Sequence, residues 1–198
     1  MKKILILTSK TGGGHVSLAE SFADRLTHYQ VEIVDPQPSL IHWHYRLVSR
    51  HALWLWAAEF KFGDTPERAL FGHKIFATLL AKPLASLLQQ SKPELIITTY
   101  PFLSYEVTRV MKQIGVDVPL VMMLSDPNGV HNAWLTEKDA AATFAPTVED
   151  YDQAIAAGFE ASRLHLSGWI VREQFYRTDE STRANVMRDL NLDPKKFT

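Results

Sequence analysis

A glycine-rich segment followed directly by a histidine is the first feature of this chain that could do chemistry. Residues 8–15 read Thr-Ser-Lys-Thr-Gly-Gly-Gly-His. Glycines let a ligand approach the backbone closely, and free N–H groups at a helix start attract anions. The segment is not a Walker loop, and contiguous Gly12, Gly13 and Gly14 do not match Gly-x-Gly-x-x-Gly. We expect an anion site here, with a tight turn of flexible glycines as the alternative.

His15 is the candidate base of this segment. It begins a helical pattern, and the positive end of a helix dipole disfavours the imidazolium form. A neutral histidine beside an anion site could accept the proton of an incoming hydroxyl. The alternative is an ordinary surface histidine at a helix start.

A second polar group follows the apolar stretch 120–124. It contains Asp126, His131 and Trp134, and the intervening 127–129 read as a turn. We expect Asp126 and His131 on a loop at the same sheet edge as His15, where an acid could bind ligand hydroxyls and an indole could stack. Asp126 and His131 alone would make a poor metal site, so no metal is expected. Alternatively, Asp126 caps the turn and Trp134 lies in the core.

The elements that must position these residues alternate between strand and helix. Short apolar runs predict strands at 4–8, 31–35, 95–99, 120–124 and 164–167. Helical patterns occupy 15–28, 103–114 and 148–157. Such alternation implies right-handed crossovers and a doubly wound, mostly parallel α/β sheet, which binds ligands at the carboxyl ends of its strands.

Two segments depart from this alternation. Residues 36–92 are longer than one crossover requires, and we expect a mostly helical insertion that Pro83 breaks or kinks. Residues 181–192 look helical and lead to a linker at 193–198. We therefore expect one domain at 1–178, an interdomain helix and linker at 179–198, and a further domain beyond them.

Aromatic and basic side chains gather at 40–62. This stretch holds three of the five tryptophans of the chain and a single acid. Tryptophan favours the membrane–water boundary, and basic residues favour anionic lipid. The residues expected to contact a membrane are Trp43, Arg46, Arg50, Trp54 and Trp56. Alternatively, two helices pack these rings into the core of the domain.

Composition excludes several classes of protein. The 198 residues carry 21 Lys and Arg against 22 Asp and Glu, without the basic surplus that nucleic-acid binding favours. The chain contains no cysteine, which excludes thiol nucleophiles and Cys-based zinc sites. No apolar run approaches the roughly 18 residues of a membrane span. We expect a globular protein without a nucleic-acid partner.

The motifs occur in an order that resembles a known family. They are Gly12-Gly13-Gly14-His15 with Ala19, Asp126…His131-x-x-Trp134, Pro146-Thr147, and Gly168-x-x-Val171-Arg172-x-x-Phe175. This order is similar to the amino-terminal half of the monogalactosyldiacylglycerol synthase and processive diacylglycerol glucosyltransferase group, in glycosyltransferase family 28. It also resembles, more distantly, the bacterial enzyme that adds N-acetylglucosamine to the lipid-linked peptidoglycan precursor.

The resemblance implies a two-domain GT-B fold, whose amino-terminal domain takes the lipid and whose carboxyl-terminal domain holds most of the UDP-sugar. It implies inverting transfer of galactose or glucose from a UDP-sugar to diacylglycerol, without a cofactor or obligatory metal. The enzyme would lie on the cytoplasmic side of a membrane, bound peripherally to anionic lipid. The 198 residues would be inactive without the carboxyl-terminal domain.

The resemblance also implies roles for residues. His15 or Asp126 would deprotonate the acceptor hydroxyl, and the glycine loop would face the UDP diphosphate. The remaining residues expected to face the acceptor or the diphosphate are Tyr100, Pro101, His131 and Trp134.

Two other classes remain open. Asp35 ends the second expected strand, 23 residues after Gly12, near the spacing of a ribose-binding acid in nicotinamide-dependent oxidoreductases. A non-catalytic lipid-binding module is the third possibility.

Overall fold

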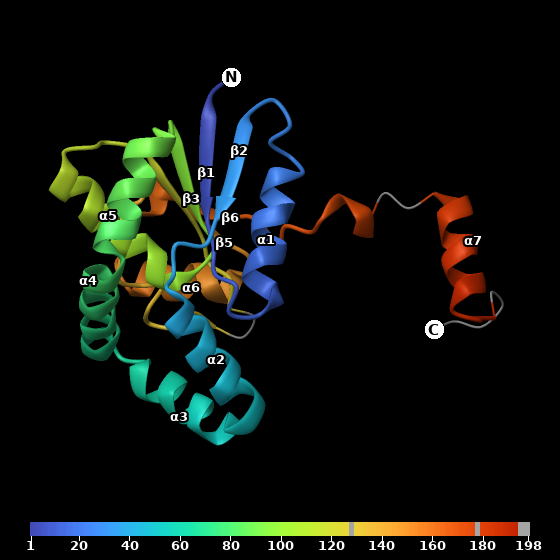
Figure 1. Ribbon diagram of the computed structural model, residues 1–198, viewed down its shortest axis with the longest axis horizontal. Coiled ribbons are helices and arrows are strands. Elements are labelled where there is room, and N and C mark those ends of the chain that lie inside the picture. Colours follow the sequence, from blue (N-terminus) through green and yellow to red (C-terminus); the bar gives the residue numbers. More distant parts are fainter. Residues whose placement is uncertain (127–128, 177–178, 194–198) are drawn as a thin grey trace.

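A six-stranded parallel sheet forms the centre of the protein, in the order β2-β1-β3-β4-β5-β6 (Figure 1). The computed structural model describes residues 1–126, 129–176 and 179–193. The strands are β1 (Lys3–Leu7), β2 (Gln30–Val34), β3 (Leu95–Thr98), β4 (Leu120–Met123), β5 (Ala142–Ala145) and β6 (Leu164–Leu166). The predicted doubly wound α/β sheet is confirmed.

Helices connect these strands. They are α1 (Gly13–Ala23), α2 (Ser39–His51), α3 (Leu53–Gly63), α4 (Pro66–Ser91), α5 (Pro101–Ile114), α6 (Val148–Ala156) and α7 (Glu180–Asp189), with short 3-10 turns at Ala161–Arg163 and Glu173–Phe175. Helix α1 ends five residues before the predicted boundary at 28 and continues as hydrogen-bonded turns. The predicted turn at 127–129 lies largely outside the described residues.

The long insertion is helical, as predicted, but Pro83 does not break it. Helix α4 runs for 26 residues with Pro83 inside it. A proline in a helix interior costs about 3 kcal/mol. Leu80, Leu84 and Leu88 are buried on one face of α4, and each buried leucine contributes about 1.5–3 kcal/mol. The packing of that face therefore outweighs the local cost.

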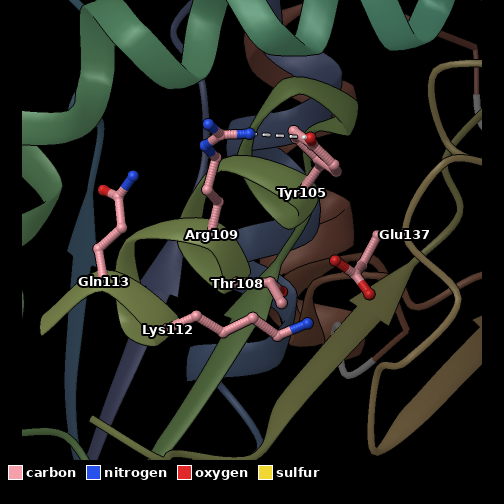
Figure 2. Close-up of a pocket in the computed structure, with 6 residues that line it drawn as sticks. All are labelled: Tyr105, Thr108, Arg109, Lys112, Gln113 and Glu137. Carbon is pink, nitrogen blue, oxygen red and sulfur yellow. Dashed lines mark hydrogen bonds between the residues drawn. The ribbon is translucent and has the colours of Figure 1, made fainter. Parts of the chain in front are cut away.

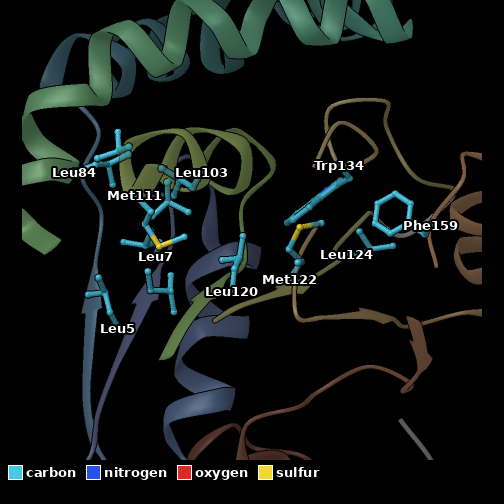
Figure 3. Packing of buried hydrophobic residues seen from close by; sticks show 14 of the residues in the cluster. Leu5, Leu7, Leu84, Leu103, Met111, Leu120, Met122, Leu124, Trp134 and Phe159 are labelled. Atoms are coloured by element: carbon cyan, nitrogen blue, oxygen red, sulfur yellow. The ribbon is translucent and has the colours of Figure 1, made fainter. Parts of the chain in front are cut away.

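The core covers both faces of the sheet. Leu5 and Leu7 of β1 belong to the larger cluster, whereas Ile4 and Ile6 belong to a smaller cluster with Ala19 of α1. Burial on both faces explains the continuous apolar run of this strand. Figure 3 shows the larger cluster, which extends from Leu5 to Trp134 and Phe159.

Helices α2 and α3 lie beyond the carboxyl ends of the strands (Figure 1). None of the described helices is long and apolar enough to cross a membrane. The predicted carboxyl-terminal helix is present as α7, and residues 194–198 of the predicted linker lie outside the described residues.

Candidate functional site

The segments that follow β1, β3 and β4 meet at one edge of the sheet. His15 lies in the first turn of α1, Thr99 follows β3, and Ser125 and Asp126 follow β4. His15 Nδ1 lies 2.7 Å from the Thr99 carbonyl oxygen and 3.2 Å from Ser125 Oγ. His15 and Asp126 line the same two cavities. The expected convergence at the carboxyl edge is therefore present.

The hydrogen bond to Thr99 assigns the tautomer of His15. A carbonyl oxygen only accepts, so Nδ1 carries the proton and Nε2 has the lone pair. The ring of Tyr100 packs edge-on against the imidazole, with ring centroids 4.9 Å apart. The backbone after β3 thus orients His15 with Nε2 as the nitrogen that can accept a proton.

Burial makes His15 neutral at physiological pH. Burial lowers its pKa from the ordinary 6.5, while the Thr99 carbonyl and the charge of Asp126 oppose that shift. A lowered pKa agrees with the expected neutral imidazole, and burial is its main cause.

Asp126 is held by the backbone of its own loop. The His131 N–H donates to Asp126 Oδ2 over 2.9 Å. Burial raises the pKa of Asp126, and the His131 N–H, the Trp134 indole and the charges of His131 and His15 limit the rise. The carboxylate therefore sits close to a histidine that it can stabilise as imidazolium.

His131 anchors the loop through both ring nitrogens. Nε2 donates to the Phe60 carbonyl over 3.0 Å, and Nδ1 accepts from the Ala133 N–H over 3.1 Å. Neither nitrogen is left to ligate a metal or to exchange a proton. No group of three metal-binding side chains occurs in the part of the chain that the structure describes.

The glycine loop is open toward the site. Gly12 has φ +89°, and a Cβ there would lie 3.1 Å from the Tyr45 hydroxyl oxygen. A Cβ on Gly13 or Gly14 would meet nothing within 4 Å. No side chain caps α1, and its first turn contains no acidic residue. This helix start can therefore receive an anion.

Two cavities meet at His15 and Asp126. The first, of about 860 Å³, is bordered by Gly12, Gly14, Ser125, Gln153 and Trp169. The second, of about 460 Å³, is bordered largely by apolar side chains, namely Ile41, Val48, Phe76, Tyr100, Pro101 and Phe102. A molecule with a polar and an apolar part could occupy both cavities and present their junction to His15.

Trp134 does not face the site. Its side chain is fully buried, with 0% exposure, in the core cluster with Met122 and Phe159 (Figure 3). We expected Trp134 to face the acceptor, and this expectation is wrong. The alternative holds, because Trp134 is a core residue beneath the loop. An indole eight residues after a loop acid is compatible with either position, and only tertiary packing decides.

The aromatic residues of α2 and α3 are on the surface. Trp43, Trp54 and Trp56 are 54%, 73% and 41% exposed. Arg46 and Arg50 are exposed as well. This exposure contradicts the alternative in which the rings pack into the core. Trp56 is partly exposed and also lines both cavities.

Several site residues escaped prediction. They are Tyr45, Asp64, Thr99, Ser125 and Trp169. Thr99 and Ser125 each directly follow an apolar run, a position that favours function in a parallel sheet. Tyr45, Asp64 and Trp169 carry no local signal because only the fold brings their segments to this edge.

Asp35 does not face either cavity. Its carboxylate accepts from the backbone N–H groups of Lys10 (2.7 Å) and Gln37 (3.0 Å) and pairs with His42 at 3.2 Å. The side chain is 4% exposed. These contacts assign Asp35 to holding the glycine loop, and they remove it as a ribose-binding acid.

A separate polar cavity of about 420 Å³ lies on α5 (Figure 2). Its wall includes Arg109, Lys112, Gln113 and Glu137, and Arg109 donates to the Tyr105 hydroxyl over 3.3 Å. None of the predicted site residues borders it.

The family model and the curated relatives indicate one family. The family described as monogalactosyldiacylglycerol (MGDG) synthase matches residues 15–171. The chain is 29% identical to monogalactosyldiacylglycerol synthase 3, chloroplastic, of Arabidopsis thaliana, over 97% of this chain and 44% of that protein. It is 26% identical to the chloroplastic synthase of Spinacia oleracea, over 97% and 39%. The chain thus spans less than half the length of these relatives.

Solved structures support the fold. UDP-N-acetylglucosamine 2-epimerase from Rickettsia bellii aligns with TM-score 0.54 and 13% identity, over 98% of this chain and 52% of that chain. Anabaena HepE in complex with UDP-glucose aligns with TM-score 0.53 and 15% identity, over 96% and 50%. At these identities the likeness supports a Rossmann-like α/β fold.

Proposed function

This chain belongs to the monogalactosyldiacylglycerol synthase family, and from that premise we propose that it is the acceptor-binding part of a glycosyltransferase. The reaction is transfer of galactose or glucose from a UDP-sugar to diacylglycerol. One observation carries the proposal: His15 and Asp126 lie where the cavity beside the glycine loop meets a cavity bordered largely by apolar side chains. Diacylglycerol has its hydroxyl next to its acyl chains, so its reacting group belongs at such a junction.

His15 is the proposed base. Its Nε2 accepts the proton of the acceptor hydroxyl while Thr99 holds Nδ1–H. The hydroxyl oxygen bonds to the anomeric carbon from the side opposite UDP, the bond from that carbon to the diphosphate oxygen breaks, and UDP leaves with the electron pair. Asp126 stabilises the imidazolium that forms, which agrees with its effect on the pKa of His15.

The glycine loop is proposed to face the departing diphosphate. Gly13 and Gly14 leave room above the start of α1, whose N–H groups favour negative charge. The reaction needs no cofactor or metal in this scheme. The charge of the leaving group is met by the helix start and by a carboxyl-terminal domain that binds the rest of the UDP-sugar.

The surrounding organisation follows from the same proposal. Residues 1–178 form the acceptor domain, and residues 179–198 lead toward the nucleotide-sugar domain. The exposed tryptophans and arginines of α2 and α3 hold the enzyme on anionic lipid at the cytoplasmic face of the membrane, where diacylglycerol is collected.

A transfer assay on the full-length protein tests this function. UDP-galactose and UDP-glucose are each supplied with diacylglycerol in anionic vesicles, and glycolipid is measured. His15→Asn should lower kcat by about 10²–10⁴-fold. The exposed His28→Asn is the matched control and should leave kcat unchanged. Transfer by neither donor, with vesicle binding intact, would favour the non-catalytic lipid-binding module.

A further inference from the structure

We propose that Asp64, at the end of α3, is a positioning residue that couples the exposed helix α3 to the carboxylate of Asp126. The inference rests on the proposed function, which assigns α3 to the membrane surface and Asp126 to the reaction. It adds a route by which membrane contact sets the geometry of the site.

Asp64 holds the loop that follows Asp126. Its Oδ1 accepts from both the backbone N–H and the side-chain amide of Asn132, each over 2.9 Å. The same oxygen lies 3.9 Å from His131 Nε2. Burial opposes ionisation of Asp64, yet the two Asn132 hydrogen bonds and His131 hold its pKa below the ordinary value. Asp64 is therefore charged when it holds the loop.

The last turn of α3 also rests on His131. The Phe60 carbonyl accepts from His131 Nε2 over 3.0 Å, and the two rings lie 4.5 Å apart between centroids. A Cβ on Gly63 would lie 3.7 Å from the imidazole. The turn is thus packed directly against one side chain of the loop.

His131 links α3 to Asp126. Its ring meets α3, while its backbone N–H donates to Asp126 Oδ2 over 2.9 Å. A displacement of α3 that moves the ring also moves this N–H. The hydrogen bond fixes the position of the carboxylate and lowers its pKa, so both depend on where α3 lies.

The solvent-facing side of helix α3 is not packed against the rest of the protein. None of its residues is buried, and Trp54 and Phe62 are 73% and 64% exposed. An element without a core residue is held by its edge contacts and by whatever covers its apolar face. A lipid surface of anionic headgroups over the exposed rings would restrain α3 and, through Asp64, the loop.

The experiment uses the full-length enzyme with Asp64→Leu, Asp64→Asn and the matched control Glu67→Gln. Glu67 is an exposed acid three residues away on α4, so its variant removes a neighbouring charge without touching the loop. Transfer to diacylglycerol in anionic vesicles is measured as kcat and KM across pH. Circular dichroism melting shows that each variant is folded.

Asp64→Leu should lower kcat by about tenfold to a hundredfold, as expected for a misplaced reacting group. Loss of the His131 N–H contact should raise the pKa of Asp126, so the fall in kcat caused by protonation of Asp126 should occur at higher pH than in the wild type. His15 and His131, the titratable neighbours of Asp126, are unchanged in this variant. Asp64→Asn keeps an acceptor oxygen and should restore part of the rate, while Glu67→Gln should match the wild type.

Hydrogen exchange provides a readout that does not need transferase activity. Anionic vesicles should slow amide exchange in residues 130–134 of the wild type but not of Asp64→Leu. Failure of wild-type transfer with this protection intact would refute the proposed function alone. An unmoved pH for the fall in kcat caused by protonation of Asp126, or equal protection in wild type and Asp64→Leu, would overturn the coupling.

Discussion

At the scale of single residues, the site is defined by which ring nitrogens are free. Both nitrogens of His131 are hydrogen-bonded, whereas His15 uses only Nδ1 for the Thr99 carbonyl. The two histidines look alike in the sequence, and each follows a glycine-containing turn. Only the hydrogen bonds separate a candidate base from a structural anchor.

The lowered pKa of His15 predicts the pH dependence of transfer. Because the base must be neutral, kcat/KM should persist below pH 6.5, the ordinary value, and fall only as pH drops through the lowered pKa. Asp126→Asn removes a charge that raises this pKa, so the acid limb should move to still lower pH while kcat falls. If Asp126 is itself the base, that variant should instead abolish transfer and leave no limb to measure.

Glycine substitutions should separate ligand approach from folding. Gly13→Ala and Gly14→Ala meet no neighbour within 4 Å and should stabilise the domain by about 0.4–1 kcal/mol. The added methyl groups should raise the KM for the UDP-sugar if the diphosphate approaches this backbone. Gly115→Ala, at φ +67° after α5, is the contrasting control and should destabilise by about 1 kcal/mol without changing KM. Unchanged KM in both loop variants would contradict the anion site.

At the scale of elements, local pattern predicts strands better than it predicts helix ends. The run Leu5–Ile6–Leu7 identifies β1 because both sheet faces are covered. Strand β5 was missed because Ala142–Ala145 contains one large apolar side chain, Phe144, and pairs with strands on both sides only in the fold. The reach of α4 past Pro83 and the burial of Trp134 depend on tertiary packing, which no spacing along the chain reveals.

A buried pair of side chains joins α4 to α5 and leads to a prediction about stability. His73 of α4 places Nδ1 2.8 Å from Glu106 Oε1 of α5 and Nε2 2.8 Å from the Ala133 carbonyl. Because that carbonyl accepts the Nε2 proton, a protonated Glu106 can donate to Nδ1. Burial raises the pKa of Glu106, in agreement. Oε2 has no hydrogen-bond partner among the described residues, which also favours the neutral acid.

Glu106→Gln should therefore keep the donor and change stability by less than about 1 kcal/mol, whereas Glu106→Ala should cost about 2–4 kcal/mol. The raised pKa makes the native state hold a proton that the unfolded chain releases. The stability of the wild type relative to Glu106→Gln should thus be greatest below the ordinary value of 4.5 and decline as pH rises through the folded pKa. Urea unfolding across pH measures both effects. A stability of the wild type relative to Glu106→Gln that instead rises over this range would refute the protonated acid.

At the scale of the whole molecule, the apolar surface and the site lie at the same end. Helices α2 and α3, which carry exposed rings, lie beyond the carboxyl ends of the strands (Figure 1). Helix α4, which follows α3 in the chain, exposes Phe71, Ile75 and Leu79. The apolar cavity is bordered by α2, α4 and α5. An enzyme that rests on a membrane through this end would have its acceptor cavity next to the lipid that supplies it.

This orientation predicts the effect of removing the exposed tryptophans. Trp43→Ser with Trp54→Ser should weaken binding to anionic vesicles about tenfold to a hundredfold, because each ring loses apolar area that lipid would cover. Thermal unfolding should be unchanged, since both side chains are more than half exposed. Arg46→Gln with Arg50→Gln should weaken binding mainly at low salt, by about 1 kcal/mol for each charge.

Tyr29→Ser is the matched control for the tryptophan pair. Tyr29 is also exposed but directly precedes β2, at the amino ends of the strands and therefore away from the site. Vesicle sedimentation should show wild-type binding for this variant. Equal loss of binding in Tyr29→Ser and in the tryptophan pair would mean that the membrane meets no particular end of the protein. Retention of binding by the tryptophan pair would remove α2 and α3 from the membrane surface, and with them the reason for placing the acceptor cavity against lipid.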